Sequence, residues 1–143
     1  LAHALPADGR LISLEFDPGH AEVARKNIDR AGFSDRVEVR LGRAIDTLPG
    51  VQGDGPFDLV FIDAPGTGFS RIAGKLTRPG SLIIVDNVVR GGEVANAQTH
   101  DPNALGVRRM NALIAAEPRV LATAVQTVGS KGHDGFAMLL VAR

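Results

Sequence analysis

Acidic side chains stand at the ends of three apolar runs in this chain. Glu15 closes RLISLEF, Asp63 closes FDLVFID, and the pair Asp86–Asn87 follows LIIV. A carboxylate between a strand and the next helix, as at Glu15, can accept hydrogen bonds from both hydroxyls of a ribose. It can equally cap the turn that follows it, and the residue alone does not decide between these roles.

Asp63, Asp86 and Asn87 form a candidate cation site. Two carboxylates and one amide carbonyl are hard oxygen ligands of the kind that suit Mg²⁺. If their strands are parallel neighbours, these ends meet at one edge of the sheet, and a bound dication would allow the two carboxylates to lie close together. The alternative is that the same side chains only cap the turns that follow the strands.

Alternating strands and helices must position these residues. The hydrophobic pattern predicts strands at residues 10–16, 37–41, 57–63, 82–85, 120–128 and 136–142, and helices at residues 17–32, 44–48, 70–76 and 104–117. This order predicts an α/β fold with a mostly parallel sheet and helices on both faces. The last two strands have no helix between them and should be antiparallel.

The connections follow from glycine, proline and polar clusters. We expect a loop at residues 52–56, a turn at 65–68, a polar loop at 89–103 and a loop, GSKGHDG, at 129–135. The run FDLVFID is nearly all apolar, which is typical of a strand buried on both faces.

Composition narrows the class of protein. The chain has 143 residues, which suits one domain, and its 16 basic residues balance 16 acidic ones. Neutrality gives no electrostatic reason to expect a nucleic-acid or membrane partner. The absence of cysteine excludes disulfides, zinc–thiolate sites and a cysteine nucleophile, and agrees with a cytoplasmic location. The start, LAHALPADGR, reads as the end of a helix, so we expect a trimmed product.

The spacing of several motifs resembles one family. The run from GRLISLEFDPGH through VEVRLG, then FDLVFIDA, RPGSLIIVDNVVRGG and DGFAMLLVAR, is similar to bacterial catechol and caffeoyl-CoA type O-methyltransferases. These are metal-dependent enzymes with the Rossmann-like fold of class I methyltransferases that use S-adenosylmethionine. The resemblance covers nearly the whole chain.

The resemblance implies roles for the residues at the strand ends. It implies a cofactor site formed by Glu15, Phe16, Gly42, Arg43, Ala44 and Asp63, and a site for a divalent cation, Mg²⁺ in the first place, formed by Asp63, Asp86 and Asn87. Glu15 would bind the ribose hydroxyls, Phe16 would pack on the adenine, and Gly42 would allow close backbone approach. The cation would bind two oxygens of a small aromatic diol and orient one for methyl transfer. A homodimer is also implied.

The sequence departs from the family pattern twice. The glycine-rich first strand, which would lie centrally in the sheet, should precede Leu1 and is absent, so two neighbouring strands lose a ladder partner. The family lysine after the FIDA strand is replaced by Gly66, and the nearby Lys75 lies well along the next predicted helix. We therefore assign no general base.

Three other functions stay open. A methyltransferase fold that serves as a binding or assembly module would explain the missing first strand and the missing lysine. A nicotinamide-dependent dehydrogenase would share the ribose-binding acid, although no hydride-transfer residues are visible. The Asp63-Ala64-Pro65 turn is similar to that of base-modifying methyltransferases, but the cysteine of the cytosine-modifying branch is absent.

Overall fold

The computed structural model describes residues 1–63, 69–130 and 132–143, and these form two compact units, residues 1–50 and 51–143. The turn predicted at residues 65–68 lies outside the described residues. None of the described helices is long and apolar enough to cross a membrane.

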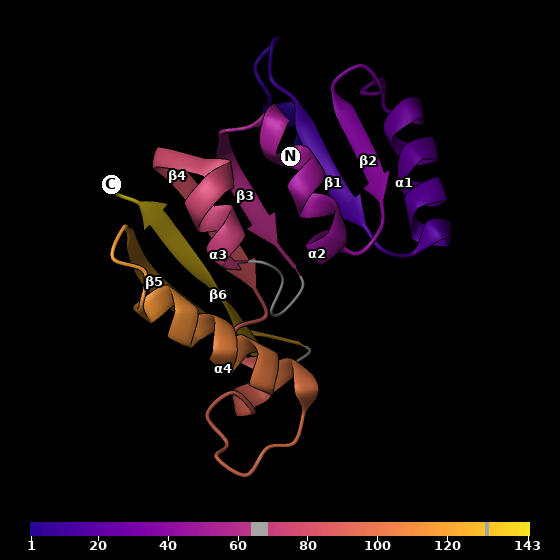
Figure 1. Ribbon diagram of the computed structural model, residues 1–143. Coiled ribbons are helices and arrows are strands. Elements are labelled where there is room, and N and C mark those ends of the chain that lie inside the picture. The colour runs from indigo at the N-terminus through magenta and orange to yellow at the C-terminus, as the bar shows by residue number, and fades with distance from the viewer. Residues whose placement is uncertain (64–68, 131) are drawn as a thin grey trace. The chain divides into compact units, whose positions relative to one another are not determined.

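The first unit contains a two-stranded parallel sheet and its connecting helix (Figure 1). Its elements are the short 3-10 helix η1 (Ala2–Ala4), β1 (Leu11–Glu15), α1 (Pro18–Arg30), β2 (Val37–Leu41) and α2 (Ala44–Thr47). β1 and β2 run in register from Leu11 opposite Val37 to Glu15 opposite Leu41. Both predicted strands and the predicted helix between them are therefore confirmed.

The sequence around α1 explains where this helix begins and ends. The Asp17 carboxylate accepts a hydrogen bond from the His20 backbone N–H at 2.9 Å, and Pro18 occupies the first turn. That hydrogen bond lowers the pKa of Asp17. After the helix, Gly32 has a φ of 74°, a left-handed conformation that favours glycine.

The second unit is built on a four-stranded sheet in the order β3-β4-β6-β5 (Figure 1). Its elements are β3 (Phe57–Ile62), α3 (Phe69–Arg71), the π-helix η3 (Ile72–Leu76), β4 (Thr77–Asp86), η4 (Arg90–Gly92), α4 (Pro102–Ala115), β5 (Val120–Gly129) and β6 (Gly132–Val141). β3 and β4 are parallel, whereas β6 is antiparallel to both β4 and β5, as predicted for the final pair. In the described chain β1 pairs only with β2, and β3 only with β4, so each has one ladder partner.

The predicted start of the strand at residues 82–85 is wrong. β4 begins at Thr77 rather than at residue 82, and the register against β3 shifts between Phe57 and Leu59. The buried Ser81 hydroxyl donates to the Phe57 carbonyl at 2.7 Å and accepts from the Arg78 N–H at 3.0 Å. These bonds attach the Arg78-Pro79-Gly80 segment to β3, although proline and glycine favour a turn there.

A second predicted boundary that is wrong is the loop at residues 129–135. β5 and β6 form a hairpin that continues to Gly129 opposite Gly132, so His133 and Asp134 belong to β6. Pairing with Val128 and Thr127 provides hydrogen-bond partners for the backbone N–H and C=O groups of this polar segment. This gain outweighs the low strand propensity of its residues. The chain after Thr47 also differs from prediction, because a 3-10 helix, η2 (Leu48–Asp54), replaces part of the loop.

The core of the second unit lies on one face of its sheet. α4 buries Ala104, Val107, Met110 and Ile114, and the same core contains Ile83, Val85, Leu139 and Val141. On the opposite face, Leu59 is 42% and Phe61 49% exposed. The prediction that this strand is buried on both faces is therefore wrong. Helices that connect successive strands in one direction along a sheet return on the same face, because these crossovers are right-handed.

An ion pair just after α4 should stabilise the fold at neutral pH and lose this effect in acid. The Glu117 carboxylate accepts from Nε and Nη2 of Arg119 at 2.7 and 2.8 Å, and these hydrogen bonds lower the pKa of Glu117 to about 2 from 4.5. Because the folded-state pKa is depressed, this stabilisation is complete above pH 4.5 and is lost as the pH falls through about 2.

We therefore expect Glu117→Gln to lower the free energy of unfolding at pH 7 and to flatten its decline on acidification. Urea unfolding between pH 7 and pH 3 measures both effects. Glu22→Gln, which removes a highly exposed carboxylate paired with Lys26, is the control. Equal pH slopes in the two variants would contradict the expectation.

Candidate functional site

In the first unit, the carboxyl ends of β1 and β2 bring Glu15 and Gly42 together. The Gly42 N–H donates to the Glu15 backbone carbonyl at 2.8 Å, directly beyond the last register pair. One carboxylate oxygen of Glu15, Oε1, accepts the Asp17 N–H at 2.8 Å. The capping role that the sequence left open is therefore present, and among the described residues no hydrogen bond engages Oε2, which can accept one from a ligand.

Gly42 is constrained in two ways. Its φ is 139°, and a Cβ atom there would lie 2.8 Å from the Thr47 side chain. A side chain at this position would therefore be strained and would crowd α2. The bare backbone leaves space for a ligand to approach the end of β2.

Phe16, Arg43 and Ala44 lie at the same strand ends. The Phe16 side chain is 68% exposed beside Glu15, an arrangement that suits stacking on a flat ring. Arg43 precedes α2 and pairs with Asp46 at 3.6 Å, with both side chains largely exposed. Ala44 is half-buried at the first position of α2. The first unit thus collects five of the predicted cofactor residues.

In the second unit, Asp63 and Asp86 lie at neighbouring strand ends. Ile62 and Val85 are register partners in the parallel pair β3–β4; Asp63 directly follows Ile62 at the end of β3, and Asp86 directly follows Val85 as the last residue of β4. Adjacent strands are about 4.8 Å apart, so the two backbones emerge side by side. Asp63 is exposed and Asp86 is half-buried. The predicted proximity of these two strand ends is confirmed.

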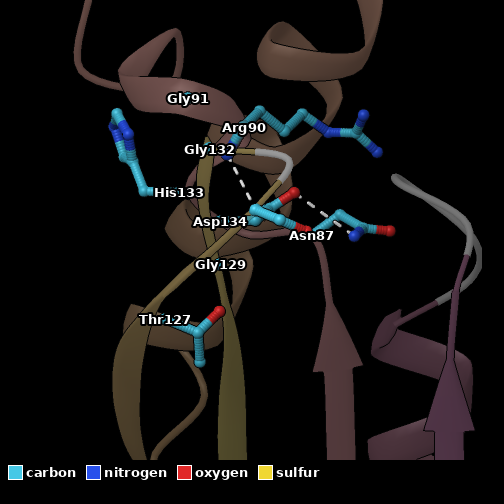
Figure 2. Close-up of a pocket in the computed structure, with 9 residues that line it drawn as sticks. Asn87, Arg90, Gly91, Thr127, Gly129, Gly132, His133 and Asp134 are labelled. Atoms are coloured by element: carbon cyan, nitrogen blue, oxygen red, sulfur yellow. Dashed lines mark hydrogen bonds between the residues drawn. The ribbon is translucent and has the colours of Figure 1, made fainter.

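Asn87 follows Asp86 in a left-handed conformation, with a φ of 58°. Its N–H donates to Asp86 Oδ1 at 2.8 Å, and its side-chain Nδ2 donates to Asp134 Oδ2 at 3.3 Å (Figure 2). The amide nitrogen of Asn87 is therefore engaged, and its oxygen is the atom left for a ligand.

Asp134 also holds the backbone after Asn87. Its Oδ1 accepts N–H groups of Val89 at 3.1 Å, Arg90 at 2.9 Å and Gly135 at 2.8 Å. Burial alone would raise the pKa of Asp134, but these hydrogen bonds and that from Asn87 together lower it. Asp134 is therefore an anionic acceptor at neutral pH, surrounded by donors.

A pocket of about 640 Å³ opens beside these residues, between the start of η4 and the end of the β5–β6 hairpin (Figure 2). Its wall includes Asn87, Arg90, Thr127, His133 and Asp134. Arg90 has a φ of 51°, and its Nε is buried with no hydrogen-bond partner in the described part of the chain. The pocket thus has an amide, a cation and an imidazole on its wall.

Gly66, at the position of the family lysine, lies outside the described residues, and Lys75 is exposed on η3. Residues 1–63, 69–130 and 132–143 contain no cluster of three or more His, Cys, Asp or Glu side chains that could hold a metal ion. The predicted cation ligands are of another composition, two carboxylates and one amide.

Sequence reasoning missed Asp134 as a member of this site. A signal for it exists, because Asp134 and Gly135 directly precede the apolar run FAMLLV. Gly135 is buried, and a Cβ atom there would lie 2.5 Å from the Val125 carbonyl. An aspartate beside a glycine that must stay small indicates a specific backbone arrangement rather than a solvated loop.

Comparison with known proteins agrees with this arrangement. Residues 1–139 match the O-methyltransferase family. The chain is 50% identical to a catechol O-methyltransferase of Niastella koreensis (99% of this chain, 66% of the relative) and 50% identical to one of Mycobacterium tuberculosis (99% and 64%). It is 52% identical to the O-methyltransferase of Bacillus cereus solved in complex with SAH, with a TM-score of 0.91 over 99% of this chain and 66% of that one.

The chain spans about two thirds of the length of these relatives or slightly less. Its structural similarity to the Bacillus cereus enzyme confirms the predicted Rossmann-like methyltransferase fold. The family match, the identities and the fold agree with one another across both units. The chain therefore belongs to the O-methyltransferase family.

Proposed function

We propose that this protein transfers a methyl group from S-adenosylmethionine to a hydroxyl of a small aromatic diol or phenol, assisted by a divalent cation. The observation that carries the proposal is the strand-end pair Asp63 and Asp86 with Asn87 beside it, in a chain 50% identical to proteins named catechol O-methyltransferase. The SAH complex of the Bacillus cereus relative supports the choice of methyl donor.

The first unit would hold the nucleoside part of the donor. Glu15 Oε2 would accept hydrogen bonds from the ribose hydroxyls while Oε1 keeps the turn closed through the Asp17 N–H. The exposed Phe16 ring would stack on the adenine, and Gly42, Arg43 and Ala44 would line its edge. The family resemblance also implies a role for Asp63 toward the donor, and this role stays a prediction.

The second unit has donor chemistry that fits a divalent cation. Asp63, Asp86 and the Asn87 side-chain oxygen would be its protein ligands, a set that suits Mg²⁺. When bound, the cation supplies Lewis-acid stabilisation of negative charge on the accepting hydroxyl. The protein would orient that hydroxyl and exclude alternative poses through the pocket at Asn87 and Arg90.

No side chain is assigned as general base. Lys75 is exposed on η3, and Gly66 offers no basic group. The methyl group of a sulfonium donor is already activated, so positioning can supply most of the rate enhancement. We propose further that the two units belong to one methyltransferase domain, since one family match spans both. The homodimer and the cytoplasmic location stay predictions.

Isothermal titration of the full-length protein with S-adenosylhomocysteine, with and without Mg²⁺, tests the proposal. We expect saturable binding, and we expect turnover of catechol when S-adenosylmethionine and Mg²⁺ are both supplied. Failure to bind under either condition would exclude the proposed function. Binding without turnover of any diol would instead favour the non-catalytic binding module.

A further inference from the structure

The two carboxylate oxygens of Asp134 accept hydrogen bonds from different partners. Oδ1 accepts the Val89 and Arg90 N–H groups of the segment after Asn87 and the N–H of the adjacent Gly135, whereas among the described residues Oδ2 accepts only the Asn87 side chain (Figure 2). The two residues are 47 positions apart and meet because β6 runs antiparallel to β4. One oxygen therefore anchors the loop, and the other contacts a proposed cation ligand.

The contact at Oδ2 determines which way the Asn87 amide faces. An asparagine side chain presents an oxygen on one edge and an NH₂ group on the other, and rotation by half a turn exchanges them. A carboxylate can only accept hydrogen bonds, so the edge facing Asp134 must be NH₂. The opposite edge then carries the oxygen, which is the atom that can bind a cation.

The backbone of Asn87 does not fix the orientation of its side-chain amide. Asn87 has a φ of 58°, and its own N–H is already bonded to Asp86. Among the described residues, Asp134 is the one partner of the Asn87 side chain. Without Asp134, either edge of the amide could point toward the cation position, and the NH₂ edge would repel a cation.

We propose that Asp134 is a positioning residue, which fixes the Asn87 amide so that its oxygen faces the divalent cation. The inference rests on the proposed cation site at Asp63, Asp86 and Asn87. Groups that orient metal ligands in this way typically change metal affinity by about 10–100-fold when they are removed.

Mn²⁺ binding to the full-length protein, followed by electron paramagnetic resonance, tests the inference without any turnover. In Asp134→Asn, an acceptor can remain for the backbone N–H groups, but an NH₂ group then faces Asn87. We expect Mn²⁺ affinity to fall by at least about tenfold. Asp101→Asn removes one carboxylate at the start of α4, where asparagine also caps a helix, and should bind like the wild type.

A swapped pair separates orientation from charge. In Asn87→Asp combined with Asp134→Asn, the new amide donates to the new carboxylate, whose second oxygen faces the cation, and the net charge equals that of the wild type. We expect this double variant to recover most of the lost affinity. A carboxylate at position 87 has no NH₂ edge to turn away from the cation, so orientation predicts that Asp134→Asn costs much less Mn²⁺ affinity in the Asn87→Asp background than in the wild type. A purely electrostatic role of Asp134 predicts the same loss in both backgrounds.

The relative Mn²⁺ affinities of these variants decide whether Asp134 positions Asn87. The positioning role is overturned if Asp134→Asn binds Mn²⁺ as tightly as the wild type does, or if the double variant binds Mn²⁺ no more tightly than Asp134→Asn. If Asp134→Asn does not fold, as judged by circular dichroism, the comparison of Asn87→Asp with the double variant decides in the same way. Absence of Mn²⁺ binding in the wild type would instead refute the cation site of the proposed function.

Discussion

Asp86→Ala is expected to lower the turnover of a catechol substrate by at least about a hundredfold, because several kcal/mol of charge stabilisation from the cation would be lost. Asp86 ends β4, at the strand end neighbouring Asp63, and its Oδ1 accepts the Asn87 N–H at 2.8 Å. Its removal would therefore delete one cation ligand and release the backbone of a second. Steady-state kinetics at saturating S-adenosylmethionine and Mg²⁺ measure the effect.

Two further variants make this measurement specific. Asp86→Asn keeps an acceptor for the Asn87 N–H and removes the charge, so a large loss there as well points to the cation rather than to the turn. Asp58→Ala removes an exposed carboxylate of β3 that pairs with Arg78, and should retain wild-type turnover. Turnover in Asp86→Ala equal to that in Asp58→Ala would remove Asp86 from the mechanism.

Glu15→Ala is expected to weaken binding of S-adenosylhomocysteine by roughly 10- to 100-fold. Hydrogen bonds to a charged group each contribute about 1.5–3 kcal/mol, and a tenfold change in Kd corresponds to about 1.4 kcal/mol. Calorimetric titration of the full-length protein measures the loss. The expected effect is on affinity for the nucleoside, and Mn²⁺ binding should be unchanged.

The turn at Glu15 needs its own control, since Oε1 also accepts the Asp17 N–H. Glu15→Gln can keep that bond through its amide oxygen while presenting NH₂ in place of Oε2, so it should also bind weakly if the ribose contact matters. Glu22→Ala changes an exposed carboxylate of α1 and should bind normally. Normal binding by both Glu15 variants would show that this residue serves only as a cap.

Local sequence determined much of the fold. The apolar runs ending at Glu15, Leu41 and Ile62 became strands at the predicted places, and Asp17 with Pro18 started α1 as expected. Strand periodicity and helix capping depend on residues within a few positions of one another, so the sequence alone displays them. The same holds for the acidic strand ends, because a parallel pair must bring equivalent ends to one edge of a sheet.

Tertiary structure decided what depends on contacts between distant segments. It extended β4 back to Thr77 through the Ser81 hydroxyl, and it left Leu59 and Phe61 half-exposed although their run predicts full burial. Polar residues 132–135 became strand because β5 supplied partners for their backbone groups. The antiparallel pairing of β6 with β4 carried Asp134 to Asn87, and no local pattern records a contact across 47 residues. The sequence thus determined which ligand types end each strand, while antiparallel pairing of β6 decided which way the Asn87 amide faces.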